Sequence, residues 1–358
     1  IRLRPSQAST HWIPPHRYNL LSDRSLPWTT HAKTIVDIAA SLTEGTQSAF
    51  FRPMAQVALA NAFQMLDELG EKVTITRAYH LLTSHAVATQ ALEDLGDMTS
   101  SPERERIAEF FRTTFVGARA YEQREGIEGT IKTYLGFFLD PDVANVFSSD
   151  EPNSFVLSSV EAGSIITLTM PQRFVTERRY IQTYLKILFY FQALRRFEKP
   201  TAERKNENLL LLVADEFQDI ATAAEDGISD HKIADRIRAA NLAIIAAVQS
   251  EVSLDPAIGL QKRKVLTLNM RSRLIFRAAD HEGALSSAEF IGKRMIWKRS
   301  RTSRPFGGIT LGRREEEEYR IKPSALLRLR DYRAVIVHPS KRYQTRRPVK
   351  RRTYNSES

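Results

Sequence analysis

Two parts of the chain differ in the spacing of their apolar residues. Between residues 31 and 147 apolar positions recur at helical spacing, as at Ile35, Ile38 and Leu42. Over 148–340 short apolar runs alternate with helical segments, which is typical of β–α–β units and a parallel sheet. The sequence therefore predicts an all-helical subdomain followed by an α/β domain.

The helical part is predicted to contain several helices joined by short loops. Ser101 suits an N-cap and Pro102 the first helical position, so one helix should begin there. Residues 1–30 contain four prolines and little periodicity, and within them 1–5 resemble the end of a strand. The expected helices are 31–45, 50–69, 76–94, 101–122 and 127–139.

The α/β part is predicted from runs of apolar residues. The run Leu209–Ala214 reads as a strand buried on both faces, as in a parallel sheet. Other expected strands are 163–170, 242–248, 264–268 and 273–278, and the expected helices are 176–197, 230–240 and 284–293.

Polar residues follow two of these predicted strands. Asp215 and Glu216 come directly after the first, and Gln249 ends the next. In open α/β sheets ligands bind outside the carboxyl ends of the strands, where two acids and an amide suit a magnesium–phosphate site. The alternative is a core strand followed by solvated acids, with Gln249 capping a loop.

Arg238 lies eleven residues before Gln249, near the end of a predicted helix. A guanidinium there can bridge phosphate oxygens, within the subunit or from a neighbour. Alternatively, it only complements the helix dipole, and Arg236 competes for the same role. A shared parallel sheet would also bring Met170 and Arg277 to the crevice.

The usual phosphate cradle, Gly-x-x-x-x-Gly-Lys-Ser/Thr, does not occur in the 358 residues. Gly292-Lys293 repeats only its last fragment, without a strand before it. Either the cradle precedes Ile1 or the protein binds no triphosphate. A start at Ile rather than Met favours the first interpretation, in which the chain is a fragment.

The excess of basic residues predicts that the protein binds a polyanion. The net charge is +10, and seven of the twelve residues in 341–352 are Lys or Arg. Further basic clusters lie at 262–264 and 293–304. Such clusters favour nucleic acid or anionic lipid, although a charged tail can also serve solubility alone. The absence of cysteine excludes disulfides and thiolate metal sites, and no apolar window is long enough for a transmembrane helix.

A series of short motifs follows one order along most of residues 15–340. The motifs are Tyr18–Leu21, Gly129–Ile131, Leu139–Val143, Gly163–Ile166 with Met170-Pro171, the helix Glu177–Tyr190, Val213–Phe217, Arg238, Gln249, Asn269–Arg277, Gly292 and Lys322–Arg330. Their order and spacing resemble those of type IV secretion and conjugation coupling proteins of the TraG/TraD kind, in the FtsK–HerA group of P-loop ATPases.

The resemblance implies a RecA-like parallel sheet, an incomplete P-loop NTPase domain here, with an all-helical insertion. Residues 1–30 would end the N-terminal part of the nucleotide-binding domain, 31–147 would be the insertion, and 148–340 the C-terminal part. The basic tail 341–358 has no counterpart carried over from the family.

The resemblance also assigns site residues. Asp215 and Glu216 would be the Walker B pair, with Asp215 on magnesium and Glu216 activating water for ATP hydrolysis. Gln249 would be the sensor and Arg238 the arginine near the phosphates. The Walker A loop and a membrane anchor would both precede Ile1, so this segment alone is expected to be inactive.

The expected function is an ATP-driven DNA translocase that delivers DNA or nucleoprotein to a type IV secretion or conjugation channel. The family implies a homo-hexamer at the cytoplasmic face of the bacterial inner membrane, with a relaxase and secretion components as partners and ATP and Mg²⁺ as cofactors. Two alternatives stay open: a non-catalytic module that recruits DNA or relaxase, and a related packaging ATPase.

Overall fold

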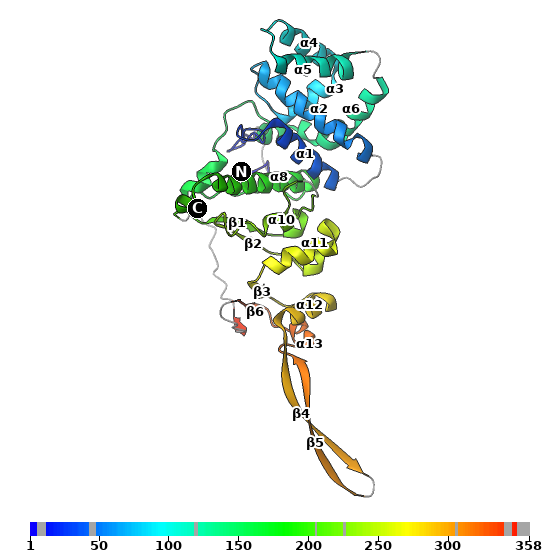
Figure 1. The fold of residues 1–358 in the computed structure, drawn as a ribbon, viewed down its shortest axis with the longest axis vertical. Coiled ribbons are helices and arrows are strands. Elements are labelled where there is room, and N and C mark those ends of the chain that lie inside the picture. The colour runs from blue at the N-terminus through cyan, green and yellow to red at the C-terminus, as the bar shows by residue number, and fades with distance from the viewer. Residues whose placement is uncertain are drawn as a thin grey trace. The chain divides into compact units, whose positions relative to one another are not determined.

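The computed structural model describes most of the chain (Figure 1). Its contacts divide the chain into two units, residues 1–213 with 219–245 and residues 214–218 with 246–358. This division follows contacts and differs from the boundaries predicted at residues 30, 147 and 340, which stay a prediction. The described residues are 1–5, 12–42, 48–117, 121–204, 206–224, 227–304, 307–339 and 346–348.

The first unit is mostly helical between residues 28 and 147, as the apolar spacing predicts. The predicted start at Ser101 is confirmed, because its side chain accepts a hydrogen bond from the Arg104 amide at 3.3 Å and Pro102 opens the helix. The helices are α1 (Trp28–Leu42), α2 (Ser48–Glu68), α3 (Ile75–Thr83), α4 (His85–Gly96), α5 (Pro102–Phe111), the π-helix η1 (Arg112–Val116), α6 (Tyr121–Leu135), the 3₁₀ turn η3 (Gly136–Leu139) and α7 (Pro141–Phe147).

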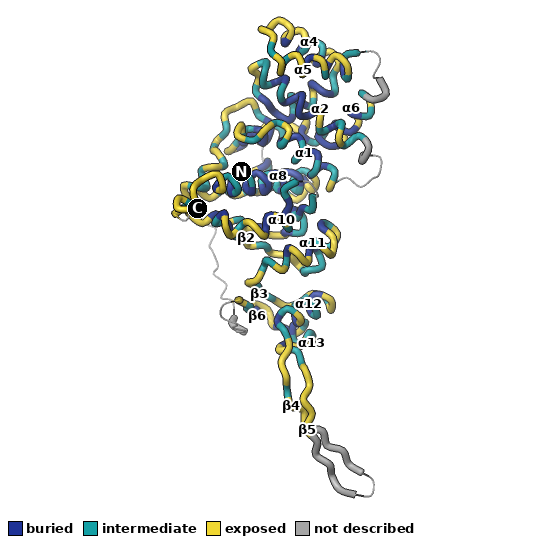
Figure 2. Tube along the Cα trace, viewed as in Figure 1, coloured by how far each residue is buried: buried dark blue, intermediate teal, exposed yellow. Residues whose placement is uncertain are grey.

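The helices α1 to α7 bury one continuous apolar core, drawn dark blue in Figure 2. Large side chains such as Phe63, Phe111 and Phe138 are fully buried in it. The same core continues into α8 (Val175–Leu194), where the Tyr180 hydroxyl donates to the Ile35 carbonyl of α1 at 3.2 Å. The predicted apolar stripe of α8 therefore packs on the helical region.

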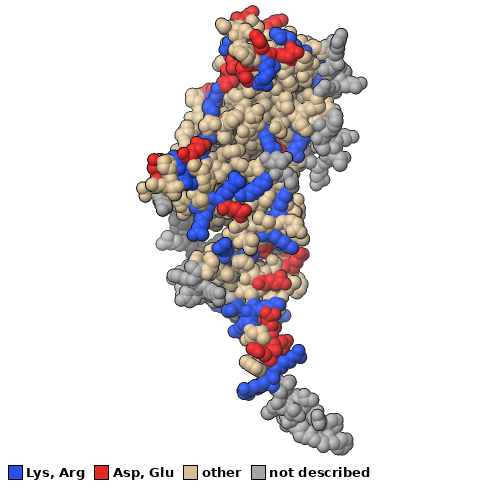
Figure 3. All heavy atoms as spheres, in the orientation of Figure 1, with Lys and Arg blue, Asp and Glu red and all other residues tan. Residues whose placement is uncertain are grey.

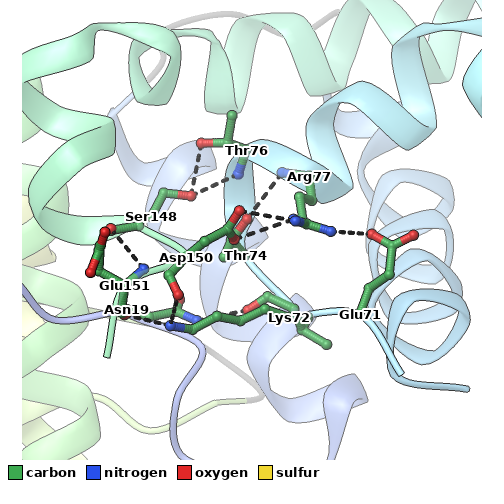
Figure 4. A network of polar contacts seen from close by, with 11 residues as sticks. Asn19, Glu71, Lys72, Thr74, Thr76, Arg77, Ser148, Asp150 and Glu151 are labelled. Atoms are coloured by element: carbon green, nitrogen blue, oxygen red, sulfur yellow. Dashed lines mark hydrogen bonds and ion pairs between the residues drawn. The ribbon is translucent and has the colours of Figure 1, made fainter. Parts of the chain in front are cut away.

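Polar contacts join the segment that follows α7 to the start of α3 and the turn before it (Figure 4). Arg77 donates to both carboxylate oxygens of Asp150, at 3.2 and 2.9 Å, and Lys72 donates to the Asp150 carbonyl at 2.6 Å. The amide of Thr76 donates to Ser148 Oγ at 2.9 Å. An exposed ion pair such as Arg77–Asp150 contributes little free energy. The hydrogen bonds that involve main-chain groups, from Lys72 and from the Thr76 amide, should therefore contribute more to holding these two segments together.

His31 of α1 is buried between two partners. Its Nε2–H donates to the Asp23 carbonyl at 2.9 Å, so its Nδ1 accepts from the Tyr184 hydroxyl at 2.7 Å. Burial lowers the pKa of His31 below its ordinary 6.5, and the hydrogen bond to Asp23 opposes this only in part. The fold therefore favours the neutral imidazole.

We expect the His31 pKa to make stability depend on pH. Because the folded pKa lies below the unfolded one, the contribution is complete above the unfolded pKa of about 6.5 and is lost as the pH falls through the folded pKa. The midpoint of thermal unfolding should therefore fall more between about pH 7.5 and pH 5.5 in the wild type than in His31→Gln, whose amide keeps both hydrogen bonds without titrating. Equal falls in the two proteins would contradict this assignment.

Two strands follow α8 in the chain, β1 (Leu210–Ala214) and β2 (Leu242–Ala246), and they form one sheet. The Leu210 amide donates to the Asn241 carbonyl at 3.0 Å and the Ala247 amide to the Ala214 carbonyl at 2.9 Å. Since the partners advance together along both strands, β1 and β2 run parallel, as predicted.

The prediction that Leu209–Ala214 is buried on both faces is wrong. One face of the pair packs on α8 through Leu210, Leu242 and Tyr190. The alternate residues point away, and Leu211 and Val213 are 49% and 65% exposed. The apolar run therefore has one face buried against α8 and one exposed face.

Three other predicted strands differ from the structure. Residues 163–170 contain only the bridge of Thr169 to Arg2, which is parallel and bears out the strand-like character of residues 1–5. Residues 264–268 belong to α11 (Asp255–Asn269). The segment at 273 is a strand, β3 (Arg273–Ile275), but it pairs antiparallel with β6 (Arg333–Val337) in another sheet.

In the first unit the predicted helix at 230–240 is shorter than expected, since α10 is Asp230–Ile233 and turns follow it. Short elements elsewhere in the chain complete the assignment. They are the 3₁₀ turns η4 (Leu157–Ala162), η5 (Arg195–Glu198), η6 (Phe217–Asp219) and η7 (Glu251–Leu254), and the helix α9 (Thr201–Arg204).

The second unit has its own small core. Ala284, Ala288 and Ile291 of α12 (His281–Ile291) pack against Leu326 of α13 (Pro323–Leu327) and Val335 of β6. A long antiparallel hairpin, β4 (Lys293–Arg304) and β5 (Gly307–Tyr319), leaves this core. Of the predicted basic tail 341–358, only the backbone of β7 (Arg346–Pro348), paired with β6, lies within the described residues.

None of the helices in the described ranges combines the length and the apolar character needed to cross a bilayer.

Candidate nucleotide site at the carboxyl ends of two parallel strands

The carboxyl ends of β1 and β2 meet through main-chain hydrogen bonds. The Ala247 amide donates to the Ala214 carbonyl, and the Phe217 amide donates back to the Ala247 carbonyl, both at 2.9 Å. Asp215 and Glu216 lie between these two contacts, and Gln249 follows Ala247 by two residues. The structure therefore brings the predicted acids and the predicted amide to one edge of the sheet.

The acidic pair occupies a tight turn. Glu216 has φ of +52°, a left-handed conformation that a non-glycine residue rarely adopts. The carboxylate of Asp215 accepts the Glu216 amide at 3.0 Å, which stabilises this turn. Strained backbone of this kind concentrates at functional sites.

Gln218 is a residue that the sequence reasoning missed. Its amide nitrogen donates to Glu216 Oε2 at 2.7 Å, from the 3₁₀ turn η6. The contact restricts the rotamer of Glu216 and leaves Oε1 open to a ligand. The sequence could have indicated it through spacing, because the side chain of Gln218, two residues after Glu216, can reach the Glu216 carboxylate within a single tight turn.

The side chains of Asp215, Glu216 and Gln249 are exposed to solvent. Within the described part of the chain no three acidic or imidazole side chains gather as a metal cluster. This composition fits magnesium better than zinc or calcium, because protein-bound Mg²⁺ keeps several waters and uses one or two carboxylates beside substrate phosphates. The donors present thus suit a nucleotide-borne cation.

Arg238 lies before the first residue of β2, whereas Gln249 lies after its last, so this strand separates them. The turn that follows Arg238 is held by Arg196, whose guanidinium donates to the Ala240 carbonyl at 3.0 Å and the Asn241 carbonyl at 3.3 Å. The Arg238 side chain is exposed. The structure therefore leaves Arg238 on the amino side of β2, and its role near phosphates stays a prediction.

Two further residues expected at the crevice lie elsewhere. Arg277 follows β3, which belongs to the antiparallel sheet, and its guanidinium pairs with Asp331 at 3.0 Å. Met170 is buried in the apolar core of the first unit. Both expectations assumed one continuous parallel sheet, and they are wrong because, among the strands that the structure describes, only β1 and β2 pair in parallel.

A buried polar network in the first unit was also invisible in the sequence. Asp230 accepts from Lys186 Nζ at 2.6 Å, from the Tyr190 hydroxyl at 2.7 Å, and from the amide and hydroxyl of Thr222 at 2.6 and 3.0 Å. Burial lowers the pKa of Lys186, and the Asp230 carboxylate opposes that shift. The network ties α10 and the segment before it to α8.

Comparison with known structures identifies the fold. The chain is 14% identical to plasmid coupling protein TrwB in complex with ADP and Mg²⁺, with a TM-score of 0.61, covering 96% of this chain and 75% of that one. TrwB in complex with the non-hydrolysable GTP analogue GDPNP gives 14% identity and a TM-score of 0.61, with 96% and 76% covered. The unbound form of the bacterial conjugative coupling protein TrwBdeltaN70 gives 15% and 0.59, with 89% and 69% covered. The predicted RecA-like P-loop NTPase fold is thereby confirmed.

Comparison with curated protein sequences gives no significant match. A family model, described as the type IV secretion-system coupling protein DNA-binding domain, matches residues 19–346. This match includes both strands of the acidic edge and the whole helical region, and the resemblance inferred from the motifs is confirmed. The chain therefore belongs to the family of type IV secretion-system coupling proteins.

Proposed function

We propose that this chain is part of an ATP-driven DNA translocase that delivers DNA or nucleoprotein to a type IV secretion or conjugation channel. The observation that carries the proposal is the acidic pair, held by main-chain hydrogen bonds beside the end of β2, with Gln249 at the same edge. Membership of the coupling protein family and the nucleotide-bound state of the similar TrwB structures support it.

Each polar residue at the edge has a role suited to its position. Asp215 would hold a Mg²⁺ ion, directly or through water, and that ion would neutralise charge on ATP phosphates. Glu216, oriented by Gln218, would accept a proton from the attacking water. Gln249 would donate a hydrogen bond to a terminal phosphate oxygen or to that water.

Arg238 would act on the nucleotide of a neighbouring subunit. Arg238 precedes the first residue of β2 and its side chain is exposed, which suits a surface that faces another copy. An arginine supplied in trans stabilises transition-state charge in many NTPases. This role requires the ring that we propose, a homo-hexamer on the cytoplasmic face of the bacterial inner membrane, working with a relaxase and with secretion components.

DNA-stimulated hydrolysis in the protein that carries this chain tests the proposal. We expect single-stranded DNA to raise the rate of ATP hydrolysis, and removal of Mg²⁺ by a chelator to abolish it, because phosphoryl transfer depends on the cation for charge neutralisation. Phosphate release would be measured with and without DNA and chelator, with restoration by added Mg²⁺ as the control. DNA binding without any turnover would contradict the motor and favour the recruitment module.

A further inference from the structure

The hairpin β4–β5 carries its charges in two distinct zones. Near its base the strands pair opposite signs: Arg294 lies across from Glu318. Lys293 reaches diagonally across the strands, and its Nζ lies 3.5 Å from the carboxylate of Glu317, the residue across from Met295. The acidic run 315–318 of β5 lies across from only two basic residues of β4 in this zone, Lys293 and Arg294, so the zone carries more acidic than basic side chains.

Farther along the hairpin the register opposes like charges. Lys298 lies across from Arg314, and Arg299 lies across from Arg313. Lys298 also reaches Glu316 at 3.0 Å, but the three arginines have no acidic partner among the described residues. Like charges directly opposite each other destabilise a strand pair. The two cross-strand pairs therefore form a cationic zone that an anionic ligand would stabilise.

An aromatic side chain borders the cationic zone. Trp297 is 67% exposed, and because side chains alternate along a strand it shares one face of the hairpin with Arg299, Arg313 and Glu315, the residue directly across from it. Met295, two residues nearer the base, is 57% exposed on the same face. The pair Lys298 and Arg314 lies on the other face. Figure 2 shows the described part of the hairpin largely in the colour of exposed residues, and Figure 3 shows basic side chains next to its grey segment.

We propose that this hairpin face binds single-stranded nucleic acid, with Trp297 stacking on a base and Arg299 and Arg313 contacting the flanking phosphates. A single strand alternates bases and phosphates, and this face places an aromatic ring beside two guanidinium groups. Base–aromatic stacking and a basic track are the usual means of binding single strands without sequence preference. An acidic peptide would satisfy the arginines but would leave Trp297 without a partner, so the aromatic favours nucleic acid.

The inference rests on the proposed role in DNA transport, but it can be tested without ATP. Binding of a fluorescent oligothymidine of about 20 nucleotides to the full chain would be followed by anisotropy across a salt series, for the wild type and variants. Arg299→Gln with Arg313→Gln should weaken binding and reduce the slope of log affinity against log salt by about 1.4, since each phosphate contact on a single strand contributes about 0.7. Trp297→Leu should weaken binding roughly ten-fold with little change in slope.

The matched control is Arg328→Gln with Arg330→Gln, which removes the same charge from exposed positions of the second unit outside the hairpin. We expect this variant to change affinity and slope much less. Equal losses of affinity in the two double variants would overturn the inference, and so would an unchanged affinity in Trp297→Leu. Displacement of the oligothymidine by polyglutamate at a lower concentration than by unlabelled oligothymidine would overturn it as well. If the hairpin variants bind normally while DNA still stimulates hydrolysis, the hairpin assignment fails and the proposed function stands. If the wild type does not bind DNA at all, both fail.

Discussion

Replacement of Glu216 by Gln should reduce ATP turnover of the protein that carries this chain by about 10²- to 10⁴-fold, the usual contribution of a general base. Gln keeps the size of the side chain and can still contact Gln218, but its neutral amide cannot accept a proton from water. Nucleotide affinity should change little, because Asp215 and not Glu216 is proposed to hold the cation. Steady-state phosphate release and equilibrium binding of a fluorescent ATP analogue would separate the two effects.

The control for this substitution is Glu289→Gln, which neutralises an exposed carboxylate in the helix α12 and not in the acidic turn. Its turnover should match the wild type. A Glu216→Gln protein that hydrolyses ATP at the wild-type rate would remove Glu216 from the chemistry. Parallel loss of nucleotide affinity and turnover would instead assign Glu216 to cation binding.

The acidic edge could be predicted because its signal is local. Six apolar residues in a row indicate a strand, and the carboxyl end of a parallel strand is where ligands bind, so Asp215 and Glu216 followed from sequence order alone. Gln249 followed from the next apolar run. The main-chain contacts of Ala247 with Ala214 and Phe217 show that both runs end at the same edge.

Features that depend on contacts between distant residues were not predictable from one sequence. The open face of Leu211 and Val213 depends on which elements cover the sheet, and an apolar run has the same composition in either case. Residues 264–268 contain Val and Leu and resemble a short strand, but they continue the helix α11. Short apolar segments of this kind are ambiguous between helix and strand until packing is known.

The hairpin β4–β5 was missed for a different reason. Its strands carry charged residues on both faces, as in Arg294 and Lys298 against Lys293 and Arg299, so no alternation of apolar and polar positions marks them. A turn signal was present, because Pro305 follows the first run and the second run opens with Gly307 and Gly308. Strands that are stabilised by cross-strand charge pairs can be recognised in a sequence only when the pairing register is known.

Loss of the Asp230 carboxylate should destabilise the first unit more than any other single polar change in the described network. Asp230→Ala would remove the carboxylate that neutralises the buried Lys186 ammonium and accepts from the Tyr190 hydroxyl and the Thr222 amide. Breaking a buried pair in this way costs about 3–5 kcal/mol. In a unit of this size the midpoint of thermal unfolding should fall by on the order of 10 °C.

A second variant distinguishes the effect of the buried Lys186 charge from a simple loss of packing. Lys186→Met combined with Asp230→Asn removes both charges, keeps the shape of both side chains, and leaves an amide oxygen to accept from Thr222. Because buried ion pairs can often be replaced by neutral groups at little cost, the double variant should recover most of the stability lost in Asp230→Ala. Calorimetric unfolding of the wild type, the single variant and the double variant would measure this. If the double variant were as unstable as Asp230→Ala, the loss would come from packing around α10 and not from the loss of the carboxylate beside the Lys186 ammonium.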